Sequence, residues 1–225
     1  MKIILFLIFF VHFAFSFENS VGIGVIYSKN IYIQNEDKKM VLPMVYYEND
    51  DLYIKGIEFG YKISPLFSLV VEPSFHSASI TALPTQKDTI LGGVKFEQRF
   101  GKYKMSSKLV RDMGNIHDGV IGKVQLSKAI VAFPTIIIPS FGLEYESKKV
   151  TKYLYGVPLN TPYEKYTPKE SVSVTAGLMG IYNINNTYAL NLMVNKKFLS
   201  DEITNSPIVN SSNKTLYLLS GVYKF

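Results

Sequence analysis

The chain has 225 residues, contains neither cysteine nor tryptophan, and carries a formal net charge of +6. The absence of cysteine excludes disulfides, thiol catalysis and cysteine metal sites. The basic residues are scattered and form no block, so the positive charge does not indicate a nucleic-acid-binding surface.

The first 16 residues have the pattern of an export signal. Lys2 precedes an almost unbroken apolar run that ends at Phe15, and Ala14-Phe15-Ser16 reads as a small-x-small cleavage site. The run is shorter than the roughly 20 residues of a membrane-spanning helix. We therefore expect a signal peptide over residues 1–16 and one mature domain over residues 17–225, with a retained N-terminal anchor as the alternative.

The remainder of the chain alternates apolar and polar residues with the period of a β-strand. In one such run, Val94, Phe96 and Phe100 alternate with Lys95, Glu97 and Arg99. Alternation alone fits a soluble sandwich as well as a membrane barrel. Several runs last about ten residues, close to the 9–11 residues of a tilted membrane strand, whereas soluble strands have about 5–6. Tyrosine and phenylalanine also gather at the strand ends, as in the aromatic girdles of a barrel.

The predicted fold is all-β, a transmembrane antiparallel up-and-down β-barrel of about 12 strands, within a range of 10–14. The expected strands are residues 20–28, 30–35, 39–48, 51–63, 66–76, 89–100, 102–111, 118–128, 134–148, 170–183, 187–198 and 214–225. Residues 20–35 could instead form a single strand. The long connectors, about 149–169 and 199–213, are expected on the outer side, which places both termini in the periplasm.

The chain ends on aromatic residues at alternate positions. Tyr217, Tyr223 and Phe225 share one face of the last expected strand. The final strand of an outer-membrane barrel must close against the first, and aromatic rings belong at the membrane–water boundary. We interpret these three residues as barrel-closing aromatics, and the C-terminal strand as the segment that the barrel-assembly machinery would bind.

Charged residues on the polar face of the strands are expected to point into the lumen. The candidate lumen set is Glu58, Lys62, Lys95, Glu97, Arg99, Lys123, Glu144 and Glu146. Because both signs are present, these side chains could form a network that fills the interior. A barrel of about 12 strands lies between filled small barrels and open porins, so a narrow channel for small solutes is the alternative.

Two groups of residues suggest chemistry, but each has a simpler explanation. Glu72, Ser74 and His76 share one face of an expected strand, as a nucleophile and its base would. Same-face neighbours on a strand lie roughly 6.5–7 Å apart, too far for direct contact, so polar lumen or rim residues are favoured over a lipid A-modifying hydrolase. His117 could bind a metal with Asp112 or Asp118, although a solvated turn explains it better.

Several segments resemble the MipA/OmpV family of outer-membrane proteins, also called MltA-interacting proteins. The segments are Asn205-Ser-Pro-Ile-Val209, the closing Gly221-Val-Tyr-Lys-Phe225, Pro139-Ser-Phe-Gly-Leu-Glu-Tyr145, Tyr153-Leu-Tyr-Gly-Val157, Tyr46-Tyr47 and Leu52-Tyr-Ile-Lys-Gly56. The resemblance covers nearly the whole mature chain. The chain departs from the family in lacking tryptophan and in using lysine where relatives often carry arginine.

The resemblance implies a barrel in the outer membrane, surrounded by its lipid. Some members are linked to a scaffold role between a murein-degrading transglycosylase and a murein synthase. The family has no agreed catalytic residues. The expectation is therefore a non-enzymatic scaffold or interaction protein without a cofactor, whose partner is a murein hydrolase or synthase.

Overall fold

The computed structural model describes residues 19–75 and 78–225. Its strands are β1 Ser20–Ser28, β2 Lys38–Glu48, β3 Leu52–Lys55, β4 Glu58–Lys62, β5 Phe67–Ser74, β6 Thr89–Phe100, β7 Tyr103–Asp112, β8 Val120–Lys128, β9 Ile130–Ala132, β10 Thr135–Glu146, β11 Ser171–Asn183, β12 Tyr188–Phe198 and β13 Asn213–Lys224. Two helices, α1 Lys148–Tyr155 and α2 Asp201–Thr204, lie in the connectors before β11 and β13. Among the described residues, no helix is long and apolar enough to cross a membrane.

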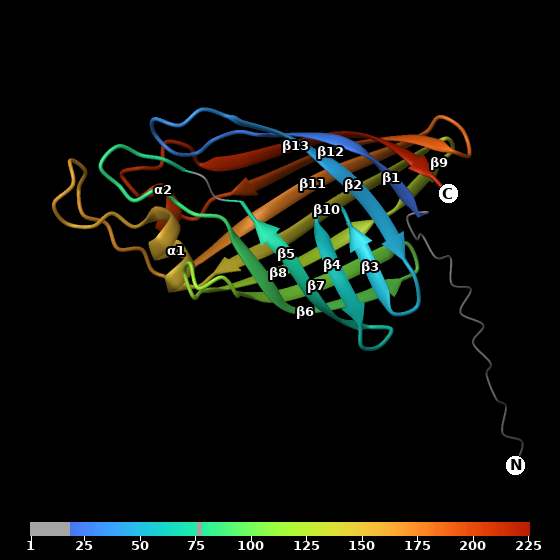
Figure 1. Cartoon of the computed structure of the whole chain (residues 1–225), viewed down its shortest axis with the longest axis horizontal. Helices are drawn as coiled ribbons and strands as arrows, with labels where there is room; N and C mark the ends of the chain where they lie inside the picture. The colour runs from blue at the N-terminus through green and yellow to red at the C-terminus, as the bar shows by residue number, and fades with distance from the viewer. Residues whose placement is uncertain (1–18, 76–77) are drawn as a thin grey trace, which may run out of the picture.

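The strands form one antiparallel sheet that closes into a barrel (Figure 1). Consecutive strands pair, except that β8 pairs with β10 instead of the short β9, and β13 pairs with β1 to close the barrel. The short β9 continues the line of β8 and pairs only with the start of β10, so 12 strands make up the wall. The predicted all-β antiparallel barrel of about 12 strands is confirmed.

Two local strand predictions are wrong, and their errors cancel in the strand count. Residues 30–35 form a turn-rich connector, because the Asp37 carboxylate accepts the Asn30 N–H and the Asn30 side chain accepts the Tyr32 N–H. These local hydrogen bonds compete with a strand ladder. The expected strand 51–63 is two strands, β3 and β4, because the chain reverses at Gly56, whose φ is +67°.

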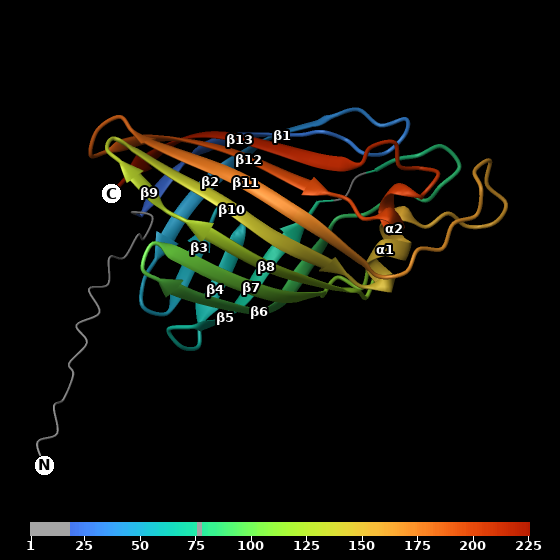
Figure 2. The same cartoon turned by 180° about the vertical axis from the view of Figure 1, so that it is seen from behind.

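The two ends of the barrel differ. The start of β1, the end of β13 and the turns after β2, β4, β6 and β11 lie at one end, here called the terminal end (Figure 1). The long connectors and both helices lie at the other, here called the connector end (Figure 2). The side of the membrane on which the termini lie stays a prediction.

The outer face of the barrel is apolar. Large side chains such as Ile23, Val41, Phe141 and Leu219 point outward and are exposed over most of the strand length. A soluble protein rarely exposes so much contiguous apolar surface, whereas a membrane barrel requires an apolar belt of this kind. On β13, Leu218 and Val222 point the other way and are buried, as the two-residue period demands.

A packed cluster closes the connector end. Val150 and Leu154 of α1, Ile203 of α2 and Ile31 of the β1–β2 connector are buried against inward-pointing side chains of the wall. The wall side chains in this cluster are Tyr53, Val70, Leu91, Val110 and Ile121. We call α1, α2 and residues 29–37 the lid, because together they cover the barrel at this end.

Hydrogen bonds fix the lid to its surroundings. The Thr151 hydroxyl donates to the Lys169 carbonyl at 2.5 Å, and the Ser206 hydroxyl donates to the Tyr155 carbonyl at 2.6 Å. These contacts link α1 to the start of β11 and to the segment after α2. The lid is therefore an ordered part of the fold.

Candidate functional site

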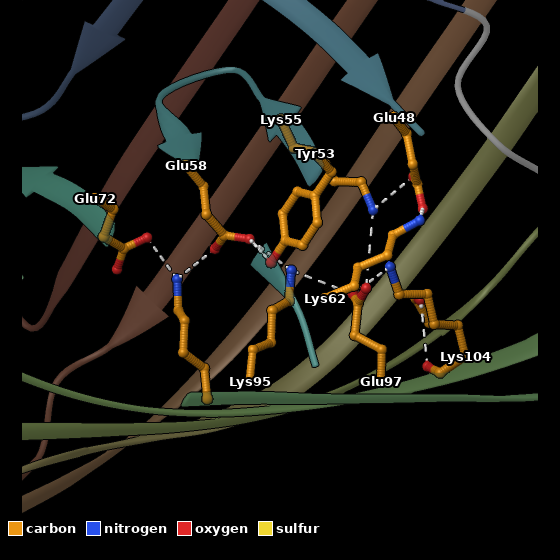
Figure 3. A network of polar contacts seen from close by, with 11 residues as sticks. Glu48, Tyr53, Lys55, Glu58, Lys62, Glu72, Lys95, Glu97 and Lys104 are labelled. Atoms are coloured by element: carbon orange, nitrogen blue, oxygen red, sulfur yellow. Dashed lines mark hydrogen bonds and ion pairs between the residues drawn. The ribbon is translucent and has the colours of Figure 1, made fainter. Parts of the chain in front are cut away.

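The interior of the barrel contains ion pairs between strands that are not neighbours. Glu58 of β4 pairs with Lys95 of β6 at 2.7 Å and with Lys108 of β7 at 2.9 Å. Lys108 also pairs with Glu72 of β5 at 2.5 Å. In a closed barrel, side chains of non-adjacent strands can meet only inside, so these groups lie in the lumen (Figure 3).

The network continues toward the terminal end. Glu48 of β2 pairs with Lys55 at 3.1 Å and with Lys62 at 2.8 Å. Glu97 of β6 pairs with Lys104 at 2.5 Å and lies 3.8 Å from Lys55. Lysines from several strands therefore share a smaller number of carboxylates, and Figure 3 shows these groups turned toward one another.

A second network joins β8, β10 and β12. Glu144 pairs with Lys197 at 2.6 Å and with Lys123 at 3.1 Å, and Glu146 pairs with Lys197 at 2.9 Å. The Ser171 hydroxyl donates to the second oxygen of Glu146 at 3.1 Å. Removing one partner of a buried pair leaves an uncompensated charge. Each carboxylate here therefore stabilises the charged form of the lysines with which it pairs.

Seven of the eight candidate lumen residues take part in these two networks: Glu58, Lys62, Lys95, Glu97, Lys123, Glu144 and Glu146. The eighth, Arg99, lies on β6 near the mouth at the terminal end. Sequence reasoning missed the partners Glu48, Lys55, Lys104, Lys108 and Lys197. The same two-residue period could have found Lys104 and Lys108, which share one face of β7.

Tyr53 of β3 fills the space between the network and the wall. Its ring is buried, its hydroxyl bonds Glu58 at 3.0 Å, and Lys55 and Lys95 lie 4.5 and 5.1 Å from the ring centre. The ring covers Gly60 on the neighbouring strand, where an added Cβ would be 2.2 Å from it. The glycine at position 60 therefore leaves space for the Tyr53 ring, over which Lys55 and Lys95 make cation–π contacts.

The terminal aromatics lie on the outer face at the seam. Tyr223 contacts Tyr188 of β12 with ring centres 5.7 Å apart, and Tyr217 contacts Tyr27 of β1 at 5.9 Å. The backbone N–H of Phe225 donates to the Asn19 carbonyl at 2.9 Å. The last strand thus bonds the first and carries exposed rings beside it.

Of the three residues that suggest a hydrolase, Glu72 and Ser74 lie on β5 in the described part of the chain. Glu72 is occupied by its ion pair with Lys108. Ser74 ends β5, and His76 lies outside the described residues.

The turn around His117 is built on Asp112. The Asp112 carboxylate accepts the backbone N–H groups of His117 at 2.5 Å, Gly114 at 2.9 Å and Asp118 at 3.0 Å. Burial lowers the pKa of His117 from its usual 6.5, although the negative charge of Asp112 opposes this effect. Within residues 19–75 and 78–225, no cluster of three or more histidines and acidic residues could hold a metal ion.

Two cavities lie at opposite ends. A cavity of about 220 Å³ opens at the terminal end and is lined by inward residues of β2, β3, β6–β8 and β10–β12. A cavity of about 470 Å³ lies among the connectors at the other end, beside His117, Tyr153 and Leu154. The lid and the ion-pair networks lie between them.

The closed antiparallel wall, the apolar outer belt and the charged interior define a membrane-embedded β-barrel protein. The family described as "MltA-interacting protein MipA" matches residues 21–225, and the chain belongs to this family. It is therefore an outer-membrane β-barrel protein of the MipA family.

Curated relatives agree with this assignment. The "MltA-interacting protein" of Escherichia coli K12 is 23% identical over 228 residues, covering 93% of this chain and 90% of that protein. The "24 kDa outer membrane protein" of Pasteurella multocida is 27% identical over 244 residues, covering 95% and 93%. A solved "bacterial polysaccharide outer membrane secretin" gives a TM-score of 0.47 at 9% identity, covering 92% of this chain and 98% of that one.

Proposed function

We propose that the protein is a non-enzymatic scaffold of the cell envelope, whose filled barrel holds a murein hydrolase or synthase at the membrane. The observation that carries the proposal is an interior that holds ion pairs and is covered at one end by a packed cluster. Ion pairs join non-adjacent strands across the lumen, and a packed lid covers the connector end. A barrel interior occupied by side chains differs from the aqueous channel of a porin, so we place the function at the surfaces of the barrel.

The names of the family and of its Escherichia coli relative support a partner among murein-processing enzymes. The relatives are named as interacting or outer-membrane proteins and carry no enzyme name. The ion pair that occupies Glu72 weakens the hydrolase alternative.

The proposed orientation places the terminal end in the periplasm. Short turns at one end and long connectors at the other are the usual asymmetry of these barrels, with the short turns inside. A signal peptide over residues 1–16, contact with outer-membrane lipid and assembly through the C-terminal strand belong to the same proposal. Under this orientation, the turns at Asp50, Pro65, Lys102 and Asn185 face the murein layer.

Photo-crosslinking in intact cells tests the scaffold. A photoreactive residue at Lys102 or Asn185 reports on the terminal end, and one at Leu159 or Glu164 gives the matched control at the connector end. The proposal predicts that the terminal-end positions capture a murein hydrolase or synthase, identified by mass spectrometry, and that the connector-end positions do not.

Capture only of abundant lipoproteins and porins at every position would contradict the proposal. Capture of the enzyme only from the connector end would refute the proposed orientation. The narrow channel is the remaining alternative, and the lid weakens it because it blocks the connector end.

A further inference from the structure

The mouth at the terminal end has the composition of an anion site. We propose that it binds a small ligand that ends in a carboxylate and carries an apolar body, either a short peptide or a short acyl chain. This site goes beyond the proposed scaffold function and stands without it, because it rests on the cavity alone.

The charges of the mouth are unbalanced. The cavity of about 220 Å³ is lined by four basic side chains, Lys55, Arg99, Lys102 and Lys104, and by one acidic side chain, Glu48. Counting Glu97 as well, which pairs with Lys104 and Lys55, four positive charges face two negative ones. The excess of two positive charges in a cleft attracts anions, since the low-dielectric wall focuses the field.

Two of the four positive groups are held in place before a ligand arrives. Lys55 and Lys104 are fixed by their carboxylate partners at 3.1 and 2.5 Å. Arg99 and Lys102 lie on the two sides of the tight β6–β7 turn, where Gly101 has a φ of +59°, and both are exposed at the rim of the cavity. A guanidinium at the rim can bind a carboxylate through two parallel hydrogen bonds.

The opposite wall of the mouth is neutral. Ile138, Met179 and Met193 supply apolar surface, and Gln125 and Asn195 supply side-chain amides. Ligand pockets are mostly apolar with a few polar groups that fix orientation, and this wall follows that rule.

The cavity size and its closed far end restrict the ligand. A volume of about 220 Å³ is below the roughly 300–1,000 Å³ of drug-sized pockets, so only a small ligand fits. The lid and the networks lie beyond the cavity, so the ligand enters and leaves by the terminal end.

Titration calorimetry on the purified full-length barrel in lipid nanodiscs tests the site. The probes are N-acetyl-dialanine and hexanoate, each compared with its neutral amide. We expect the carboxylates to bind at least tenfold more tightly than the amides, with the difference shrinking as salt is added. The tighter of the two carboxylates identifies the source as peptide or acyl chain.

The variant Arg99→Gln with Lys102→Gln should weaken carboxylate binding at least tenfold and leave the amides unchanged. The control, Lys148→Gln with Lys165→Gln, removes the same charge from exposed residues at the connector end and should bind as the wild type does. The gel mobility of the folded barrel verifies that both variants fold. Equal binding of carboxylate and amide, no binding by the wild type, or equal weakening in both variants would overturn the site.

Failure of this site and failure of the scaffold are distinguishable. Loss of carboxylate binding with retained photo-crosslinking removes only the site, whereas binding without capture removes only the scaffold.

Discussion

Pro43 of β2 and Pro73 of β5 lie on the two strands that flank the short β3–β4 hairpin. The backbone nitrogen of each proline faces the hairpin side of its strand, at a position beyond the end of the hairpin where no neighbouring strand pairs with it. On β2, the Val45 carbonyl accepts the Gly56 N–H, so Pro43, two residues before, faces the same side. On β5, Pro73 lies opposite Ile90, whose carbonyl accepts the N–H of Met113, the residue after β7. Ile90 therefore bonds away from β5, and the Pro73 nitrogen faces β4. β3 pairs with β2 only up to Tyr46, and β4 pairs with β5 only up to Val71.

Proline at both positions removes a backbone donor that would have no ladder partner. Neighbouring side chains such as Val41 and Val71 are exposed on the apolar belt, where an unpaired N–H is costly. We therefore expect Pro43→Val and Pro73→Val each to lower the free energy of unfolding by about 1–3 kcal/mol, measured by urea unfolding in micelles.

Pro65→Val is the control for these variants, because Pro65 is exposed in a turn and its new N–H would meet water. Any general effect of losing a proline on the unfolded chain appears in all three variants. An equal loss of stability in all three variants would contradict the idea that Pro43 and Pro73 avoid an unpaired backbone N–H.

The contact between Tyr53 and Gly60 predicts a strong size limit at position 60. Gly60→Ala places a methyl group 2.2 Å from the buried ring, so we expect a loss of about 1–3 kcal/mol in unfolding free energy. Gly180→Ala is the matched strand control, because its Cβ meets no atom within 4 Å. Similar stabilities for the two variants would show that Tyr53 does not pack as described.

Glu58 is the shared partner of Lys95 and Lys108, so Glu58→Gln leaves two nearly buried lysines with weaker partners. We expect a loss of about 3–5 kcal/mol in urea unfolding, the range for breaking a buried pair. Arg111→Gln removes an exposed pair at 4.0 Å and should change stability by less than about 1 kcal/mol. If Glu58→Gln behaves like Arg111→Gln, the lumen is solvated enough to make the network unimportant.

The connector end should be less stable against local unfolding at acidic pH. Burial lowers the pKa of His117 below its usual 6.5, so the unfolded connector takes up a proton at a higher pH than the folded one. The stability that neutral His117 contributes is present above about pH 6.5 and is lost as the pH falls through the lowered pKa.

Hydrogen exchange of residues 113–119 measures this effect. Exchange should accelerate between pH 7 and pH 5 in the wild type, after correction for the intrinsic rate. In His117→Asn, which cannot be protonated, the corrected exchange should stay flat. The same acceleration in the variant would assign the effect to another group.

The architecture could be predicted from the sequence because it depends on a simple period. Apolar and polar residues alternate along β6 and β13, and this pattern alone decides which side chains face lipid. Tyr217, Tyr223 and Phe225 alternate on one face, and this local pattern indicates the strand that pairs with β1 without knowledge of any distant contact.

The interior could be predicted only in part. The two-residue period places Glu58 and Lys95 on inward faces, but their contact depends on barrel curvature and strand stagger, which no local pattern contains. The lid was missed for the same reason. Val150 and Ile203 lie in short helices within expected loops, and they become core residues only because the barrel provides a surface to cover.

The closed interior is tested most directly by conductance in a planar bilayer. The purified wild-type barrel, inserted at high protein load in 1 M KCl, should give no current steps above background, because ion pairs cross the lumen and the lid covers the connector end. Reproducible ion-selective steps in the wild type, altered by Lys95→Gln or Arg99→Gln, would contradict the filled barrel and favour a narrow channel.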